Sequence, residues 1–164
     1  MQESDLNRVI NKSFRQIGFS HKMQDPPKAV ATTFGKNPFD GFSVFDGKAV
    51  YWESKLVKGY KALAFASIRD HQIEALTEIS KQSGDSGSIL PIILWGIYEP
   101  RRTKKILAFH IDFVLERMAN GEKKKKKVEV ERLVEDGWSV DVRKEYCDAK
   151  ELVRKVSWPK NSGS

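Results

Sequence analysis

The segment 40–55, DGFSVFDGKAVYWESK, constrains the fold more than any other part of the chain. Asp46-Gly47 near its middle suits a two-residue type I′ turn, and β-like runs flank this pair on both sides. With these two residues as the loop, pairing continued outward along the strands sets Asp40 directly opposite Glu53. The sequence therefore predicts a β-hairpin whose open end carries two acids.

The acids and the lysine at the open end of this hairpin predict a metal site. Lys55 lies two residues beyond Glu53, so its side chain shares the face that carries Asp40 and Glu53. Opposed Cβ atoms lie roughly 4.5–5.5 Å apart, and carboxylates this close repel each other unless a cation neutralises them. Mg²⁺ suits such a pair because it prefers carboxylate and water oxygens. The alternatives are a solvated hairpin with a weak surface salt bridge, and a register slip that separates the two acids.

The composition is that of an ordinary globular protein. The chain has 164 residues, of which 40% are hydrophobic and 31% charged, so we expect a single domain over residues 1–160 and a disordered tail over 161–164. Its one cysteine, Cys147, excludes an internal disulfide, and we find neither a signal peptide nor an apolar run long enough to span a membrane. These features favour an intracellular, cytoplasmic protein.

The net charge of +7 favours a polyanionic partner such as nucleic acid. Lysines and arginines gain affinity by releasing phosphate counterions, although an excess of lysine also serves solubility alone. The uninterrupted run Lys123–Lys127 predicts a flexible basic arm that contacts phosphates without reading base sequence, with a plain solvated loop as the alternative. The predicted DNA contacts are Lys22, Lys28, Lys36, Lys58, Lys61, Arg69, Lys123, Lys124 and Lys125.

Hydrophobic periodicity and turn residues outline the rest of the fold. Apolar residues at helical spacing predict a helix over 4–19 with Ser4 as its N-cap, and a helix over 67–82 with Ser67 and Asp70 as a capping box. Further helices are predicted over 112–118 and 149–156, and strands within 41–54, 89–98 and 105–110. This order of elements predicts an α/β protein with a central mixed β-sheet flanked by helices.

Three motifs in this order resemble a known nuclease signature. PFDGF, which contains Asp40, is followed by ESK and then by a helix that opens with His71 and Gln72, and together they look like the PD-(D/E)xK signature. More narrowly, the chain resembles RecU-type Holliday junction resolvases over roughly residues 3–115. The resemblance implies a restriction-endonuclease-like fold, a Mg²⁺ cofactor for which Mn²⁺ substitutes, branched DNA as substrate, and a homodimer. It further implies a role in DNA recombination and repair in a bacterial cell, with the cell or a phage as the source.

The resemblance also implies roles for the hairpin residues. Asp40, Glu53 and the backbone carbonyl of Ser54 would bind the metal. Lys55 would orient or activate the attacking water. The expected activity is the Mg²⁺-dependent hydrolysis of phosphodiester bonds at four-way junctions.

Three positions outside the hairpin extend the resemblance. Glu3 matches an acid of the family's first helix, although the helix dipole also favours an acid near a helix start. Gln72 would hydrogen-bond a metal-bound water or a phosphate, whereas a lone histidine such as His71 is more often structural. Only residues 24–38 stand where the family carries a long stalk, which puts selectivity for four-way junctions in doubt. Forks, nicks or duplex DNA are the alternative substrates, and a non-cleaving basic DNA-binding module is the alternative function.

Overall fold

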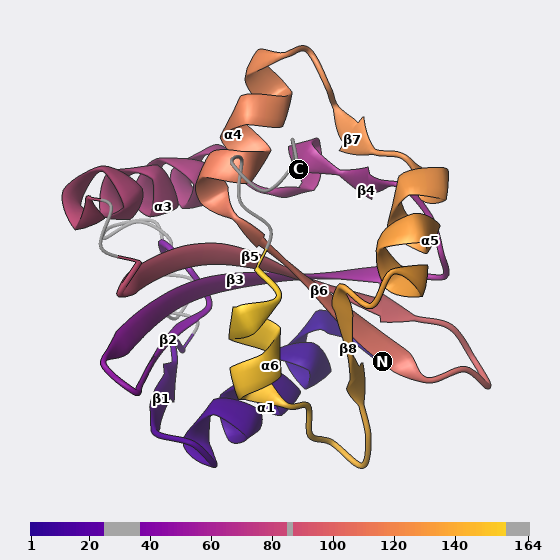
Figure 1. Cartoon of the computed structure of the whole chain (residues 1–164), viewed down its shortest axis with the longest axis horizontal. Coiled ribbons are helices and arrows are strands. Elements are labelled where there is room, and N and C mark those ends of the chain that lie inside the picture. Colours follow the sequence, from indigo (N-terminus) through magenta and orange to yellow (C-terminus); the bar gives the residue numbers. More distant parts are fainter. Residues whose placement is uncertain (25–36, 85–86, 157–164) are drawn as a thin grey trace, which may run out of the picture.

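The computed structural model describes residues 1–24, 37–84 and 87–156, and Figure 1 shows how their elements are arranged. Its helices are α1 (Glu3–Arg15), α3 (Asp70–Ser83), α4 (Ile111–Ala119), α5 (Lys127–Glu135) and α6 (Ala149–Arg154), with a short 3-10 helix, η1 (Phe65–Ser67). Its strands are β1 (Phe19–Lys22), β2 (Gly41–Phe45), β3 (Lys48–Lys58), β4 (Leu63–Ala64), β5 (Ile89–Tyr98), β6 (Lys104–His110), β7 (Lys124–Lys125) and β8 (Ser139–Val142).

Six of these strands form one mixed sheet in the order β1-β2-β3-β5-β6-β8. β3 and β5 run parallel and are connected through α3, whereas every other neighbouring pair in this sheet is antiparallel. The short strands β4 and β7 pair separately. The prediction of an α/β protein with a central mixed sheet flanked by helices is therefore confirmed.

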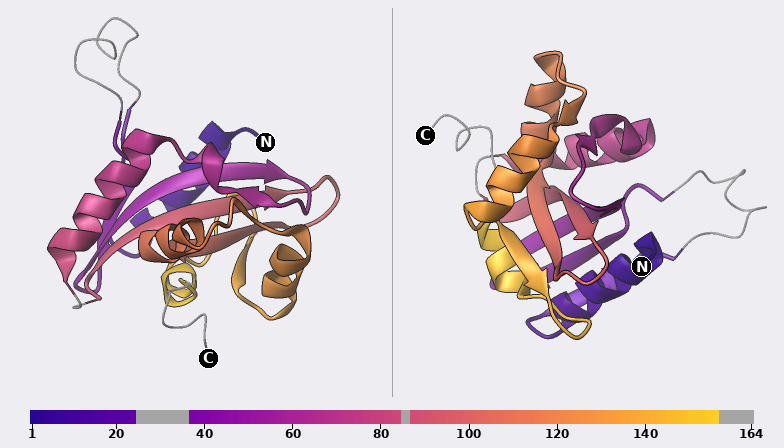
Figure 2. Two further views of the ribbon diagram at one scale, coloured as in Figure 1. Left: turned by 90° about the horizontal axis from the view of Figure 1, so that it is seen from above. Right: turned by 90° about the vertical axis from the view of Figure 1, so that its right-hand side faces the viewer.

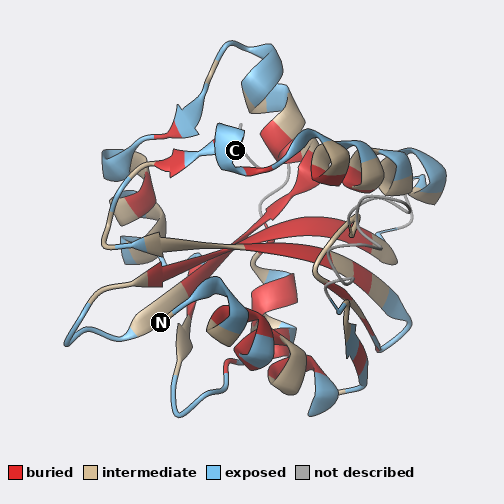
Figure 3. Ribbon diagram, turned by 180° about the vertical axis from the view of Figure 1, so that it is seen from behind, coloured by how far each residue is buried: buried red, intermediate tan, exposed pale blue. Residues whose placement is uncertain are grey.

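Helices cover both faces of the six-stranded sheet (Figure 2). One core lies between the sheet and the pair α1 and α6, where Leu6, Ile10 and Phe14 of α1 join Trp52 of β3. The other core lies between the sheet and α3, α4 and α5 and contains Trp95. β5 is buried along nearly its whole length because helices cover both of its faces, as the red central strands in Figure 3 show.

The predicted hairpin forms with the predicted register. Gly41 pairs with Trp52, and the ladder runs from there to a turn at Asp46 and Gly47. These two residues have φ values of 47° and 72°, and a type I′ turn requires positive φ at both positions. Trp52 is buried on one face of the hairpin, so the opposite face carries the two acids.

Two predicted helix boundaries are wrong because neighbouring residues form other contacts. α1 ends at Arg15 rather than at residue 19, since Phe19 begins β1 and pairs with Val44 of β2. α3 begins at Asp70 rather than at Ser67, and the residues before it form η1. Both predictions extend the helical periodicity across a segment that tertiary contacts hold in another conformation.

Neither predicted N-cap is used. Gln2 caps α1, and its backbone N–H donates to the Asp5 carboxylate at 2.8 Å. Arg69 caps α3, and its backbone N–H donates to Gln72 Oε1 at 3.0 Å. In both helices the side chain three positions after the cap accepts a hydrogen bond from the backbone N–H of the cap residue, as in one half of a capping box.

The prediction of a flexible lysine arm is wrong. The run forms β7 and the start of α5, neither of which was predicted; β1 and β8 were missed as well. Lys125 is buried, with its ammonium 3.4 Å from Glu129 Oε2 and 5.2 Å from the centre of the Phe113 ring. The strand β5 and the final helix α6 form in the regions predicted for them.

The described helices include none with the length and apolar character needed to cross a membrane. The predicted tail, 161–164, lies outside the described residues. A single domain over 1–160 stays a prediction.

Candidate metal centre

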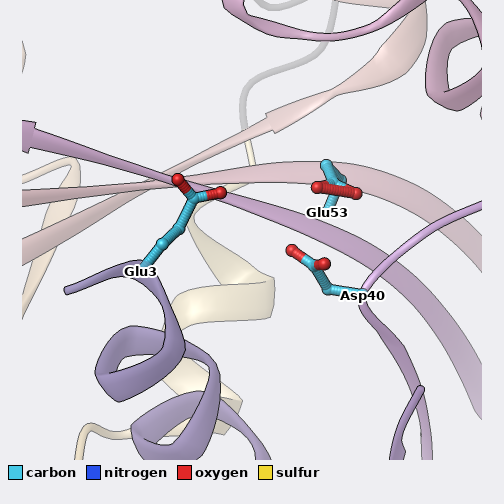
Figure 4. Close-up of side chains that lie close together, drawn as sticks. All are labelled: Glu3, Asp40 and Glu53. Carbon is cyan, nitrogen blue, oxygen red and sulfur yellow. The ribbon is translucent and has the colours of Figure 1, made fainter. Parts of the chain in front are cut away.

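Three carboxylates converge where α1, β2 and β3 meet (Figure 4). Glu3 comes from the first turn of α1, Asp40 immediately precedes β2, and Glu53 lies within β3. Each offers a carboxylate oxygen, and the three oxygens lie within 4.8 Å of one another. This spacing suits one divalent cation bound by oxygen ligands. The structure thus joins the two hairpin acids with the acid of the first helix.

Hydrogen bonds hold Asp40 beside β3. Its N–H donates to the Trp52 carbonyl at 3.0 Å, which extends the hairpin pairing by one position. Its Oδ2 accepts the Ser54 N–H at 2.9 Å and the Ser54 hydroxyl at 3.0 Å. Gly41 follows Asp40 because a Cβ at that position would lie 2.3 Å from the Trp52 ring. The Asp-Gly pair therefore lets the backbone approach the buried indole while the carboxylate is fixed at the site.

Packing of α1 on the sheet brings Glu3 to the same point. Leu6 lies so close to β5 that a Cβ at Gly96 would be 2.7 Å from Leu6 Cδ2. Asn7 is buried next to Leu6, and its side-chain amide contacts the Ser54 hydroxyl, whose one proton either Asn7 or Asp40 can accept. Asn7 was not predicted as a site residue, although its place on the helical stripe of Ile10 and Phe14 was a usable signal.

Glu53 lies in a strongly desolvating environment. It is 1% exposed, and its Oε2 has no hydrogen-bond partner among the described residues. Burial raises the pKa of Glu53 to about 9, the negative charge of Asp40 adds to this effect, and Lys55 opposes it. At neutral pH the carboxyl is therefore protonated unless a cation takes the place of the proton. A buried oxygen without a partner, within a set of oxygen ligands, fits a hard cation such as Mg²⁺.

Lys55 supplies a positive charge to this group. Its ammonium lies 3.6 Å from Glu53 Oε1 and 3.8 Å from Glu3 Oε1, and its side chain is 12% exposed. Burial raises the pKa of Glu3, whereas Lys55 lowers it. The alternative of a solvated surface hairpin is therefore wrong. One ammonium can balance the charge of only one of the three carboxylates, so the site can accept a further positive charge.

The carboxylates line a cavity of about 450 Å³, which is within the usual range of ligand pockets. The start of α3 and the strand β4 contribute to its other walls. The lining residues are Glu3, Asp40, Glu53, Lys55, Leu56, Val57, Ala62, Ala64, Ser67, Arg69, Gln72 and Trp95. The carboxylates therefore face a space in which a substrate group could lie beside them.

Of the residues predicted on or next to β3 and α3, some line this cavity and others do not. Arg69 and Gln72 line it, and Gln72 Oε1 is already bound by the Arg69 N–H. His71 is not among the lining residues. The Ser54 hydroxyl supports Asp40 from the side of α1, and metal binding by the Ser54 carbonyl stays a prediction.

The predicted lysine contacts are spread around the site. Lys22 pairs with Gly41, which pairs with Trp52, so the Lys22 side chain lies on the Trp52 face of the sheet and not on the face that carries Glu53. Lys58 ends β3 and is exposed, as is Lys61. Neither Lys58 nor Lys61 lines the cavity.

In the folded chain the lysine run lies beside one wall of the cavity. Lys124 is exposed and pairs with Ala64, which lines the cavity, and the Lys123 carbonyl accepts the Phe65 N–H at 3.0 Å. Lys125 is buried, so it is not free to contact DNA as predicted. The two remaining predicted contacts, Lys28 and Lys36, lie outside the described residues.

Comparison with known sequences assigns no family to the chain. No protein-family model matches the chain, and no similar sequence is found among the curated proteins.

Proposed function

We propose that the chain is a metal-dependent endonuclease of the PD-(D/E)xK superfamily, with a restriction-endonuclease-like fold, that hydrolyses phosphodiester bonds in DNA. The observation that carries the proposal is the group of three carboxylates and one lysine in a single cavity. Glu3, Asp40 and Glu53 offer only oxygen ligands, which suit Mg²⁺ or Mn²⁺. The unpartnered Glu53 Oε2 supports a bound cation, because a buried anionic oxygen without one is costly.

Each side chain of the site has a distinct task in this proposal. Asp40 and Glu53 hold the ion, and Glu3 completes the set from the side of α1. When bound, Mg²⁺ would polarise the scissile phosphate and lower the pKa of a bound water. The Lys55 ammonium is placed to hydrogen-bond the attacking water or the charge that develops on the phosphoryl oxygens. Arg69 offers the paired N–H donors that suit a phosphate.

The charge around the cavity supports DNA as the substrate. Arg69 lines the cavity, Lys124 pairs with a strand of the cavity wall, and the chain as a whole carries +7. Within this class we propose branched DNA, resolved by a RecU-like homodimer, because the order of the motifs resembles that family. Forks, nicks and duplex DNA are the alternative substrates.

A DNA-binding module that does not cleave is the weaker interpretation. Such a module has no chemical need for a buried glutamate with an unpartnered oxygen, which weakens the metal-free fold. The site keeps that glutamate together with Asp40 and Lys55. This combination is expected where chemistry is carried out.

Cleavage of labelled DNA tests the proposal. We expect the protein to cut at least one of a four-way junction, a Y-fork and a linear duplex with Mg²⁺, and none of them with EDTA. Glu53→Gln abolishes cutting, whereas Glu74→Gln, a matched change at an exposed position of α3, leaves it intact. Cutting that persists in EDTA or in Glu53→Gln overturns the proposal, and the relative rates on the three substrates rank their structures.

A further inference from the structure

A second cavity, of about 520 Å³, lies at the start of α1 but on another side of this helix. Residues of α1, of the turn between β5 and β6, and of the turn after β8 line it. The lining residues are Met1, Asp5, Arg8, Val9, Lys12, Tyr98, Arg102, Thr103, Lys104, Val142, Arg143, Lys144 and Glu145. None of these residues belongs to the lining of the metal centre.

α1 separates the two cavities. Successive residues of an α-helix are rotated by about 100°, so Asp5, Arg8 and Lys12 project to one side and Glu3 to nearly the opposite side. The first turn of α1 therefore has the three carboxylates on one flank and the second cavity on the other. The two sites are separated by about the 10 Å diameter of one helix.

The second cavity has a surplus of positive charge. Its lining side chains include six lysines and arginines against two acids, a surplus of four. Both acids are already paired, Asp5 with Arg8 at 2.7 Å and Glu145 with Lys12 at 2.9 Å. Lys144 has no carboxylate partner within 4 Å among the described residues. The surroundings stabilise negative charge, because hydrogen bonding and attraction by Lys12 lower the pKa of Glu145, with Lys104 adding to the effect.

Two of the remaining cations are held in place by aromatic rings. The Lys104 ammonium lies 5.6 Å from the centre of the Tyr98 ring, and the Arg102 guanidinium lies 5.9 Å from that of Tyr60. Arg102 also pairs with Glu99, which lies outside the cavity lining, at 3.1 Å. Arg143 likewise pairs with Asp141, which also lies outside the lining, at 3.1 Å. Among the described residues, Lys104 and Lys144 are therefore the cationic side chains of the lining without a carboxylate within 4 Å.

The backbone at the mouth of the cavity is held in a conformation that these residues rarely adopt. Lys144 and Glu145 have φ values of 54° and 77° in a tight turn closed by two hydrogen bonds between Arg143 and Tyr146. Such turns favour asparagine and glycine, so lysine and glutamate are unexpected at both positions. The turn is tied to α1, because the Lys12 ammonium also lies 5.8 Å from the centre of the Tyr146 ring. Strain at a cavity mouth points from structure toward function.

We propose that this second cavity binds phosphate groups, with the backbone of a nucleic acid as their source. The chemistry is that of a concave surface with surplus lysine and arginine charge, which attracts phosphodiesters and releases their counterions. This site needs no metal and no cleavage, so it is independent of the proposed nuclease activity. If that activity holds, one nucleic-acid backbone passes over the first turn of α1 and contacts both cavities.

Fluorescence anisotropy with a labelled DNA duplex in EDTA tests this site without any contribution from a metal. The double variant Lys104→Gln and Lys144→Gln should bind about tenfold more weakly near 150 mM salt and lower the logarithmic salt slope by about two units. The matched double variant Lys81→Gln and Lys150→Gln removes the same charge from α3 and α6, away from the cavity, and should change affinity by less than about twofold. An equal loss in both double variants overturns the proposal, because it would reflect net charge alone.

Glu145→Gln provides a test of opposite sign. Removing this carboxylate from the cavity lining should tighten DNA binding by about threefold, since it increases the positive surplus of the cavity by one charge. Unchanged or weaker binding by this variant counts against the site. Calorimetric titration with inorganic phosphate at constant ionic strength separates the two sources of phosphate. If millimolar phosphate binds to the wild type but not to the Lys104 and Lys144 double variant, while both proteins bind DNA equally well, the site is one for free phosphate and its assignment to nucleic acid is overturned. Loss of binding in the Lys104 and Lys144 variant, together with an inactive wild type, supports this site and refutes the nuclease.

Discussion

At the scale of the residue, the carboxyl of Glu53 links stability to function. Its pKa is raised to about 9 from an ordinary value of 4.5, mainly by burial. Between these two pH values the folded protein keeps a proton that the unfolded chain has lost, so the free energy of unfolding falls as pH rises. A residue that weakens the metal-free fold in this way, and that fits a cation, is typical of a functional position.

Glu53→Gln should therefore stabilise the metal-free protein in a pH-dependent manner. In EDTA at about pH 5 the two proteins should have similar melting temperatures, because the folded wild type is protonated there. At about pH 8 the variant should melt several degrees higher, since ~1 kcal/mol corresponds to about 2–4 °C for a chain of this size. Thermal unfolding followed by circular dichroism measures both values. A variant less stable than the wild type at the higher pH contradicts the burial argument.

Binding of a cation should displace the same proton. Calorimetric titration with Mn²⁺ in two buffers of different ionisation enthalpy should show release of about one proton per ion at neutral pH. Affinity should increase as pH rises toward about 9, the pKa of Glu53. Asp40→Asn should lose binding, whereas Asp46→Asn at the exposed hairpin turn should keep it. Unchanged Mn²⁺ binding by Asp40→Asn removes Asp40 from the ligands.

Lys55→Ala should separate DNA binding from chemistry. Lys55 is one of 29 lysines and arginines, so its loss should lower the salt slope of binding by about one unit at most. Beside the carboxylates it acts on the water or on the developing charge, where one lost group typically costs ~10²–10³ in rate. Gel shifts and single-turnover cleavage measure the two effects. Full cleavage by Lys55→Ala would remove the nuclease assignment of the Glu-Ser-Lys motif.

At the scale of the element, the hairpin shows what local sequence can predict. Asp46-Gly47 sets the turn, the turn sets the register, and the register places Asp40 opposite Glu53, so this half of the site follows from neighbouring residues alone. Glu3 reaches the site through the packing of α1 on β5 at Gly96, which no local rule predicts. The predicted role of Gln72 did not foresee that its Oε1 accepts the backbone N–H of the N-cap Arg69, because the helix was predicted to begin three residues earlier.

Gly41→Ala should damage both the hairpin and the site. The new Cβ would lie 2.3 Å from the Trp52 ring and 2.8 Å from the His21 carbonyl. Neither group can move freely, because Trp52 is fully buried and His21 is part of the strand β1. We expect a loss of ~1–3 kcal/mol in urea unfolding together with weaker Mn²⁺ binding, because Asp40 precedes this position. Gly47→Ala at the open turn meets no atom within 4 Å and should affect only stability. Normal Mn²⁺ binding by Gly41→Ala contradicts the coupling of hairpin and site.

At the scale of the whole molecule, pairing between distant segments accounts for the elements that the sequence did not reveal. β1 has four residues and exists because β2 lies beside it, and β8 depends on β6 in the same way. The lysine run carries no strand signal, yet Lys124 pairs with Ala64 because the fold brings the two segments together. Long apolar elements such as β5 are predictable because burial on both faces leaves a continuous hydrophobic run.

Resolution of a four-way junction, as proposed, requires two metal centres. Two copies of the chain would supply them, one centre from each subunit. Symmetric resolution of a four-way junction needs two active sites related by a two-fold axis. Light scattering should therefore give about twice the monomer mass of 18.7 kDa. A monomer mass with and without junction DNA contradicts this expectation and favours an enzyme that nicks one strand.

Mixed dimers provide a sharper test of the same point. A dimer of one wild-type subunit and one Glu53→Gln subunit has a single complete centre, so on a supercoiled plasmid with an extruded cruciform it should produce nicked circles, whereas the wild type produces linear molecules. Dimers that contain a Glu74→Gln subunit should behave as the wild type, because this glutamate is exposed on α3 and does not line the cavity. Co-produced subunits with two different tags allow each dimer to be isolated before the assay. Linear product from the Glu53→Gln mixed dimer would show that one centre makes both cuts, and the two-fold arrangement would then have no catalytic role.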